Sequence, residues 1–419
     1  MDSQEIDILI IGAGPSGCVA AGYLQQKGVN VKVVEKSKFP RLVVGESLIP
    51  RVMDNFQQAG LLDALDRCGF EKKKGAEFIR GEVFSTFDFS DKFGQGWDWT
   101  WQAPRADFDL AMTRELQRKG VEIQFEVAVT DIEFKNSISH TTIVDKSGVT
   151  SQITAKFVID ASGYGRVLPR LLGLSKPSQL NPHSAIFTHV KDINRPSGEQ
   201  GTQISFDVLD TQVWLWVIPF SNGLTSVGLV ANTAFIENLK GDEGTAEALR
   251  KAIQLSDFYV KRFANKSFEF EPIHLKNYSS AVTKMYGDGF SLTGNSAEFL
   301  DPVFSSGVCF ATESGLLSAK LAYRQLQGEN IDWQTEYADY MQRGIDVFTT
   351  YVQEWYTGNL QTLFFHRPEN PEVKRKICAV LAGYVWNEEN PFVKKHDRVI
   401  RTMAYMLKNN DPFSSEIFD

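Results

Sequence analysis

The chain has 419 residues, of which 42% are hydrophobic and 23% charged, and its formal net charge at pH 7 is -8. These values are ordinary for globular proteins and exclude a chain that is disordered over long stretches. The excess of acidic residues argues against a nucleic-acid partner held by a positive surface, and the length predicts two or three packed units.

The N-terminal segment MDSQEIDILIIGAG carries acidic residues where a signal peptide needs basic ones. No apolar run approaches the ~18 residues of a membrane span. We therefore expect a cytoplasmic protein with no transmembrane segment. The cysteines lie far apart and the histidines show no HxH or HExxH spacing, so we expect neither a disulfide framework nor a bound metal.

In chain order, the first predicted elements are an apolar strand at residues 6 to 11, a helix at 18 to 27 and a second apolar strand at 31 to 35. Their order and length predict a βαβ unit in a parallel sheet. Residues 152 to 160 predict another buried strand, and residues 205 to 230 alternate as antiparallel strands do. A helix is predicted at 308 to 327, with further helical segments to the C-terminus.

The turn after the first strand reads IGAGPSG, with Gly12, Gly14 and Gly17, and Glu35 ends the next strand. In a dinucleotide-binding turn the first glycine permits the tight turn, the second lets the backbone approach a pyrophosphate, and the third allows close helix packing. Glu35 would accept hydrogen bonds from ribose hydroxyls. We predict dinucleotide binding here, with a plain glycine-rich turn as the alternative. The same site would include Pro15, Ser16 and Lys36.

Two later motifs bear on which dinucleotide binds. DASG at 160 to 163 follows an apolar strand, and GNSAEFLDPVFSSG at 294 to 307 precedes a helix. Together they resemble the FAD contacts of the flavin monooxygenase superfamily. There the second motif usually begins Gly-Asp, and the aspartate binds the ribityl chain of FAD. This chain has Asn295, which can hydrogen-bond a hydroxyl but lacks the charge.

Three further motifs, RLVVGESLIP at 41 to 50, WLWVIP at 214 to 219 and DPVFSSGV at 301 to 308, resemble flavin-dependent halogenases. The branch that acts on phenols and pyrroles is the most similar. LAGYVWNEENPFV near the C-terminus extends the resemblance over nearly the whole chain. It implies cofactor contacts from Arg41, Glu46, Ser47, Arg105, Asp160, Gly163, Gly294, Asn295, Asp301, Pro302, Ser306, Gly307 and Val308.

The fold implied by this resemblance is α/β, with a Rossmann-like FAD-binding domain of the glutathione-reductase and hydroxylase type. An antiparallel β-sheet substrate domain is inserted in it, and a helical region follows. We expect the FAD-binding domain to comprise residues 1–75, 105–175 and 280–330. Residues 76–104 and 176–279 would form the sheet domain, and residues 331–419 the C-terminal helical region.

The implied reaction is that of a two-component enzyme. A separate flavin reductase supplies reduced FAD, which reacts with oxygen and a halide ion to give hypohalous acid. The acid then halogenates an electron-rich aromatic substrate, either a small molecule or an acyl group tethered to a carrier protein. No second Rossmann fingerprint is visible in the sequence, which agrees with a separate reductase.

In the family a lysine orients or captures the hypohalous acid beside the substrate. It stands five residues before a phenylalanine, and counting back from Phe78 in GFEKKKGAEF selects Lys73. A solvated run of charge is the alternative explanation for a lysine triplet. The resemblance thus implies that Lys73 is catalytic.

Trp214 and Trp216 lie on one face of a predicted strand. In the family these residues are thought to crowd the flavin and keep substrate away from it, which disfavours ordinary monooxygenation; core packing alone would also explain them. Ser305, Ser306 and Gly307 precede a helix, so their backbone N–H groups could bind the halide. A flavin contact or a helix cap would need the same residues.

Two other functions stay open on the sequence alone. An FAD-dependent hydroxylase or a prenyl-reductase-type flavoprotein shares IGAGPSG, DASG and the GNSA-like position, although WLWVIP combined with DPVFSSGV argues against it. A flavin-binding protein that has lost catalysis is the alternative from another class, and Asn295 in place of aspartate favours it.

Overall fold

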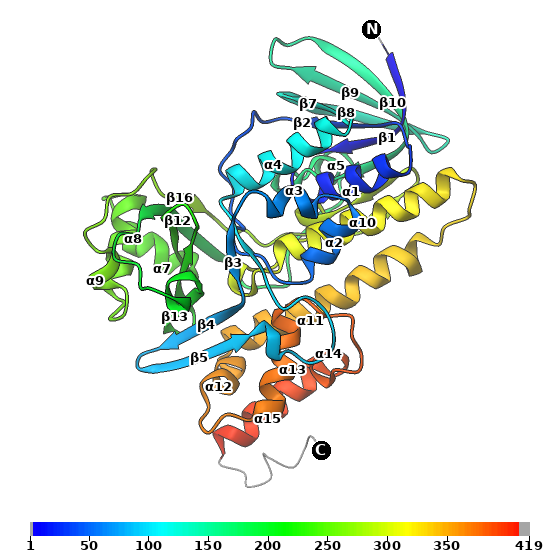
Figure 1. Cartoon of the computed structure of the whole chain (residues 1–419). Helices are drawn as coiled ribbons and strands as arrows, with labels where there is room; N and C mark the ends of the chain where they lie inside the picture. The colour runs from blue at the N-terminus through cyan, green and yellow to red at the C-terminus, as the bar shows by residue number, and fades with distance from the viewer. Residues whose placement is uncertain (1–2, 410–419) are drawn as a thin grey trace.

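The computed structural model describes residues 3–409 (Figure 1). Its largest sheet has eight strands, with β18, β19, β10, β1, β2 and β7 in that order and β8 and β9 extending it from β10. The pairs β1–β2, β1–β10, β10–β19 and β2–β7 are parallel. The strands are β1 (Ser3–Ile11), β2 (Val31–Glu35), β7 (Glu122–Phe125), β8 (Val127–Lys135), β9 (Ile138–Asp145), β10 (Thr150–Asp160), β18 (Tyr286–Gly287) and β19 (Phe290–Leu292).

The predicted βαβ unit is present in this sheet. β2 has the predicted bounds, and the predicted strand at 6 to 11 lies within β1. The helix α1 (Pro15–Gln26) begins earlier than expected because Gly14 is its N-cap and proline is well suited to the first helical position. Helix α10 (Gly307–Leu326) packs on α1 so closely that a Cβ on Gly315 would lie 2.5 Å from the backbone oxygen of Ser16.

The second sheet has seven strands, in the order β16, β12, β15, β14, β13, β4, β5. All neighbours are antiparallel except β13 and β4. The antiparallel strands predicted between residues 205 and 230 are therefore present. The members are β4 (Gly75–Arg80), β5 (Val83–Asp88), β12 (His183–Lys191), β13 (Ile204–Asp210), β14 (Val213–Pro219), β15 (Leu224–Asn232) and β16 (Ile273–Leu275).

Alternation along β14 gives this sheet two buried faces. Leu215 and Val217 belong to a core shared with residues of α8, whereas Trp214, Trp216 and Ile218 belong to the main core. Side chains of a strand alternate between faces, so the two tryptophans point together into the centre of the molecule. The covering helices are α7 (Thr233–Lys240), α8 (Thr245–Gln254) and α9 (Val260–Phe263).

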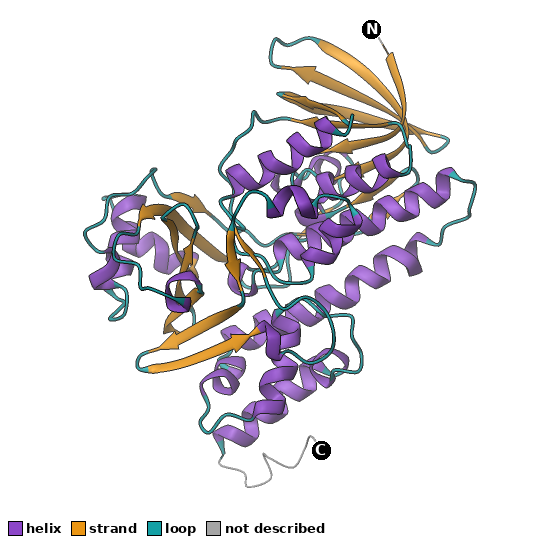
Figure 2. Cartoon of the chain, viewed as in Figure 1, coloured by secondary structure: helices purple, strands orange, loops and turns teal. Residues whose placement is uncertain are grey.

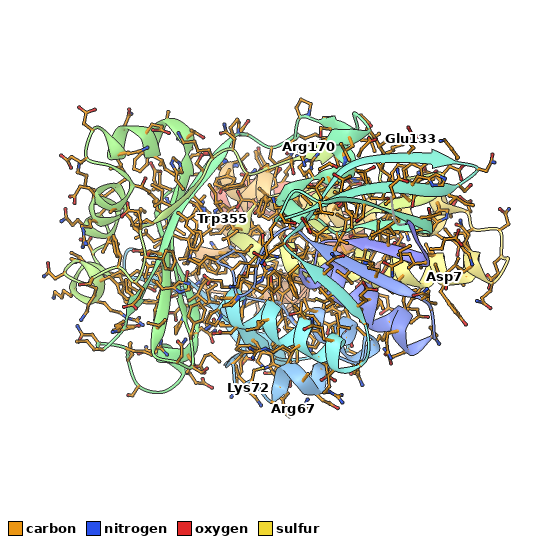
Figure 3. All side chains as sticks on the ribbon, turned by 90° about the horizontal axis from the view of Figure 1, so that it is seen from above. Asp7, Arg67, Lys72, Glu133, Arg170 and Trp355 are labelled. Atoms are coloured by element: carbon orange, nitrogen blue, oxygen red, sulfur yellow. The ribbon has the colours of Figure 1, made fainter. Side chains whose placement is uncertain are left out.

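The segment after α10 is helical within the described residues, as predicted; residues 410–419 of the predicted helical region lie outside them. Figure 2 shows these helices packed beside the β4–β5 hairpin, and Trp355, which is labelled in Figure 3, is fully buried. Phe78 of β4 packs on Trp355 and Phe364, with ring centroids 5.4 and 4.9 Å away. The helices are η5 (Gln334–Ala338), α11 (Asp339–Tyr356), α12 (Asn359–Phe365), α13 (Pro371–Leu381), α14 (Pro391–Lys394) and α15 (His396–Lys408).

Shorter elements connect these layers. The strand β6 pairs with β3 and not with the seven-stranded sheet. The division of the chain into the three predicted regions remains our proposal. The connecting elements are α2 (Val52–Gln58), α3 (Leu62–Asp66), β3 (Glu71–Lys73), η1 (Phe89–Asp91), β6 (Thr100–Gln102), α4 (Arg105–Arg118), η2 (Gly163–Gly165), α5 (Val167–Leu171), β11 (Ser175–Lys176), α6 (Glu199–Thr202), β17 (Ala281–Val282), η3 (Gly294–Ser296) and η4 (Pro302–Phe304).

Two further properties concern the described part of the chain. Across residues 3–409, none of the helices combines the length and the apolar character needed to cross a membrane. All four cysteines carry free thiols, and only Cys68 among them is exposed.

Candidate active site

A large cavity lies between the carboxyl ends of the parallel strands and the inner face of β14. In parallel α/β sheets, ligands bind outside the carboxyl ends of the strands. The predicted site residues that line this cavity are Gly12, Gly14, Pro15, Ser16, Glu35, Lys36, Arg41, Glu46, Ser47, Arg105, Gly163, Trp214, Trp216, Gly294, Asn295, Pro302, Ser305, Gly307 and Val308.

The glycine turn after β1 forms one end of the cavity. Gly12 has a φ of +104°, and a Cβ there would lie 2.4 Å from the backbone oxygen of Ala161. A Cβ on Gly17 would lie 2.0 Å from the backbone oxygen of Gly12. Gly14 has only the Arg41 guanidinium near its Cβ position, at 3.6 Å, so the backbone at the N-terminus of α1 is open to a ligand.

Glu35 is held at the end of β2 by two backbone amides. Its Oε2 accepts from the Ala13 amide at 3.0 Å, and its Oε1 accepts from the Ser37 amide at 2.8 Å. Each carboxylate oxygen has a further lone pair, and the side chain lines the cavity. Glu35 can therefore accept hydrogen bonds from ligand hydroxyls.

Two arginines on the cavity wall share one carboxylate. Arg105 donates to Asp109 at 2.8 and 2.9 Å, and to the backbone oxygen of Val44 at 2.9 Å. Arg41 Nη2 lies 3.4 Å from the same Asp109. The buried Nε of Arg41 has no hydrogen-bond partner within the described chain. An excess of positive charge and an orphaned donor fit the diphosphate of a dinucleotide.

Four predicted cofactor residues, Gly17, Asp160, Asp301 and Ser306, lie outside the cavity lining. Asp160 accepts from the amides of Ser162 at 2.9 Å and Leu168 at 2.7 Å, so its carboxylate supports the turn after β10. Asp301 accepts from the Val303 amide at 2.9 Å and from two tyrosine hydroxyls. Burial raises the pKa of both aspartates. Their carboxylates shape the loops that line the cavity.

The structure distinguishes the three lysines of the KKK triplet. Lys72 is exposed, as Figure 3 shows, with Nζ 4.5 Å from the centroid of the Trp99 ring. Lys74 is also exposed and pairs with Glu199 at 3.6 Å. Lys73 points inward from β3 and is 2% exposed. Burial lowers the pKa of its amine to about 7.

The Lys73 amine lies directly behind the cavity wall. Its Nζ donates to Ser47 Oγ at 2.9 Å and to the backbone oxygen of Leu48 at 2.7 Å. Ser47 lines the cavity, whereas Lys73 does not. A pKa of about 7 leaves a substantial fraction of the amine uncharged at neutral pH, and only that form has a lone pair with which to act as a nucleophile.

Both tryptophans of β14 are buried and line the cavity. Their ring centroids are 6.1 Å apart. Trp216 lies over Gly228 of β15, where a Cβ would be 2.2 Å from the indole, and donates to Ser226 Oγ at 3.1 Å. Trp214 instead donates to the hydroxyl of Tyr356 at 3.2 Å. They form an aromatic wall that excludes water from one side of the cavity.

The loop from Ser305 to Gly307 supplies backbone donors unequally. The Ser305 amide is used, because it donates to the backbone oxygen of Pro302 at 3.0 Å. The amide of Phe310 donates to the backbone oxygen of Ser306 at 3.0 Å and so begins the hydrogen-bond pattern of α10. Amides at the start of a helix have no acceptor within that helix, and those of Ser306 and Gly307 stand at the start of α10.

Several lining residues were not predicted from the sequence. They include Val43, Val44, Tyr164, Ile204, Phe206 and Phe299. Tyr164 directly follows DASG, and Phe299 lies two residues before DPVFSSG, so these motifs could have identified both residues. The contact of Glu46 Oε1 with His189 Nε2, at 2.6 Å, joins residues 143 positions apart and has no local sequence signal.

Comparisons with known proteins agree with this geometry. The family model described as FAD binding domain matches residues 5–329. A flavoprotein/dehydrogenase of known structure from Cytophaga hutchinsonii is 47% identical, with a TM-score of 0.94 over 97% of this chain and 100% of that chain.

Two curated relatives are halogenases. The chain is 28% identical over 415 residues to the 1H-pyrrole-2-carbonyl peptidyl-carrier-protein chlorinase of Pseudomonas fluorescens, covering 92% of this chain and 91% of the relative. It is 27% identical over 387 residues to the corresponding brominase of Pseudoalteromonas luteoviolacea, covering 91% of this chain and 92% of the relative.

These similarities confirm the resemblance to flavin-dependent halogenases and the Rossmann-like FAD-binding fold. FAD is the cofactor, and the glycine turn, Glu35 and the two arginines are the residues that fit it. The protein is an FAD-dependent oxidoreductase, and its chain belongs to the FAD binding domain family.

Proposed function

We propose that this protein is a two-component halogenase that uses FAD, oxygen and halide to halogenate an electron-rich aromatic substrate. A separate flavin reductase would supply the reduced cofactor. The substrate would be a small aromatic molecule or an aromatic acyl group tethered to a carrier protein. The similarity to a chlorinase and a brominase of carrier-bound pyrrole supports the second type of substrate. We also propose a cytoplasmic location.

The observation that carries this proposal is the buried amine of Lys73 behind the Ser47 side of the cavity. When bound and reduced, FAD supplies the electrons that activate oxygen. Lys73 would receive the hypohalous acid from the cavity, either orienting it by hydrogen bonding or exchanging one N–H hydrogen for halogen with loss of water. The lowered pKa favours the second role, since only the neutral amine is nucleophilic.

Other side chains would confine the oxidant. Trp214, Trp216 and Phe206 form an apolar wall that keeps substrate and water away from the flavin side. The Ser306 and Gly307 amides at the start of α10 would hold the halide, with the positive end of the helix dipole behind them.

The test supplies FAD, a flavin reductase, NADH, oxygen and bromide to phenols, pyrroles and a carrier-bound pyrrole, and measures halogen-dependent mass gain. We expect Lys73→Ala to lose product by about 100-fold or more while FAD affinity stays within about threefold. Lys72→Ala is the matched control, because the exposed neighbour should keep full activity. Equal activity of the two variants would remove Lys73 from the mechanism.

The same assay distinguishes a second function. The 47% identity to a flavoprotein/dehydrogenase favours an enzyme that transfers hydrogen instead of halogen, and a hydroxylase has related motifs. Consumption of NAD(P)H without a reductase, with products that gain oxygen or change in hydrogen content, would support that function.

A further inference from the structure

A chain of hydrogen bonds connects the two opposite walls of the flavin cavity through the C-terminal helices. Trp214 Nε1 donates to the Tyr356 hydroxyl at 3.2 Å, and that hydroxyl donates to Asp301 Oδ2 at 3.0 Å. Tyr278 donates to the same Asp301 oxygen at 2.8 Å. All four side chains are at most 8% exposed.

The direction of these hydrogen bonds follows from the chemistry of the groups. An indole N–H can only donate, so the Tyr356 oxygen must accept from Trp214. The Tyr356 proton is then free to point at Asp301, whose other oxygen accepts from the Val303 amide at 2.9 Å. Across residues 3–409, Tyr356 is the residue whose hydroxyl contacts both Trp214 and Asp301.

The two ends of the chain of hydrogen bonds belong to different walls. Trp214 lines the cavity from β14, and Asp301 caps the turn that leads to Ser305 and Gly307, which line it from the other side. Tyr356 and Asp301 do not line the cavity themselves. Tyr356 therefore acts through its neighbours and not through contact with a ligand.

Tyr356 is itself held rigidly at the end of α11. Its ring stacks on His183 of β12, with centroids 3.9 Å apart and planes at 18°. Its backbone oxygen accepts from Gln212 at 2.6 Å, and the Gln212 amide oxygen lies 3.2 Å from His183 Nε2. A hydroxyl fixed in this way can impose one position on both of its partners, because buried donors and acceptors are costly to leave unpaired.

We propose that Tyr356 is a positioning residue that holds the Trp214 indole and the loop after Asp301 at a fixed spacing across the flavin site. Helix α11 thereby helps to shape the cofactor pocket without lining it. This inference requires FAD binding and does not depend on halogenation.

The experiment compares Tyr356→Phe with Tyr278→Phe, which is a matched control. Both variants remove one phenol that donates to Asp301 Oδ2, but only Tyr356→Phe leaves Trp214 Nε1 without an acceptor. FAD affinity and the visible circular dichroism of bound FAD are measured for each. We expect Tyr356→Phe to weaken FAD binding by about tenfold and alter the spectrum, and Tyr278→Phe to weaken binding by about threefold or less.

A double-mutant comparison separates positioning from a loss of stability. In the Trp214→Phe background, the effect of Tyr356→Phe on FAD affinity should shrink to that of Tyr278→Phe, because the indole donor is already absent. Equal effects of the two tyrosine variants, or an undiminished Tyr356→Phe effect in that background, would overturn the proposal.

If Tyr356→Phe does not fold, a second measurement tests the proposal. Trp214→Phe should increase amide hydrogen exchange in the peptide covering residues 301–307, because the indole no longer holds Tyr356 against Asp301. Trp216→Phe is the control, since its indole donates to Ser226 within the sheet. Unchanged exchange in Trp214→Phe, or the same increase in both variants, would contradict the coupling.

Discussion

The amine of Lys73 donates to the hydroxyl of Ser47 at 2.9 Å, and Ser47 lines the cavity whereas Lys73 does not. The segment around Ser47 is also held by backbone contacts with β6. Ser47 forms an isolated antiparallel β-bridge with Gln102, and the Leu48 amide donates to the backbone oxygen of Trp101 at 3.1 Å. The buried amine therefore has a defined position relative to the flavin site.

The first prediction concerns Lys73 and pH. Burial lowers the pKa of Lys73 from 10.5 to about 7, so between these values the unfolded chain binds more protons than the folded one. Stability must then rise with pH across this window. The free energy of unfolding of the wild type minus that of Lys73→Met should rise by about 1 kcal/mol per pH unit between pH 8 and 10, measured by chemical denaturation. A difference independent of pH would show that the amine titrates normally.

The second prediction concerns the glycine turn. Gly12→Ala should weaken FAD binding by about 100-fold or more, because the new Cβ would lie 2.4 Å from the Ala161 oxygen at a φ of +104°. Gly28→Ala is the control, since Gly28 also has a positive φ but nothing within 4 Å of its Cβ position. It should cost about 1 kcal/mol of stability and keep FAD affinity. Fluorescence titration with FAD measures the affinity of both variants. Equal losses of affinity would count against a specific role for Gly12.

The third prediction concerns the contact between Glu46 and His189. The two residues are 4% and 5% exposed, and their polar atoms are 2.6 Å apart. His189→Leu leaves the Glu46 carboxylate buried without this partner, so the free energy of unfolding should fall by about 2 to 4 kcal/mol. Adding Glu46→Leu should recover part of the loss. Denaturation of the single and double variants measures both effects, and a double variant less stable than His189→Leu would argue against the pairing.

The fourth prediction concerns Arg41, whose buried Nε has no hydrogen-bond partner within the described chain. Arg41→Gln removes one of the two cations that share Asp109, so FAD binding should weaken by about tenfold and become less sensitive to salt. Arg67→Gln is the control, because Arg67 lies on the surface away from the cavity (Figure 3). FAD titrations at low and high salt provide the measurement. Unchanged affinity in Arg41→Gln would mean that the diphosphate is held by Arg105 and backbone amides alone.

Much of the fold could be predicted because its signals are local. The apolar runs of β1 and β2, the glycines between them and the acid at the end of β2 fall within 35 residues of the N-terminus. Steric crowding allows only glycine at Gly12 and Gly17, so the turn can be recognised from contiguous residues. The resemblance to halogenases added Lys73, which residue pattern alone could not distinguish from its two neighbours.

Tertiary structure decided which polar groups face the cavity and which are occupied elsewhere. Sequence motifs placed Asp301 among the cofactor contacts, but its carboxylate is occupied by Tyr278 and Tyr356. Glu46 meets His189 because β12 of the seven-stranded sheet packs against the segment that carries Glu46. Periodicity and backbone sterics act between neighbours in the chain and are readable there, whereas burial and hydrogen-bond partners depend on segments that meet only after the sheets have assembled.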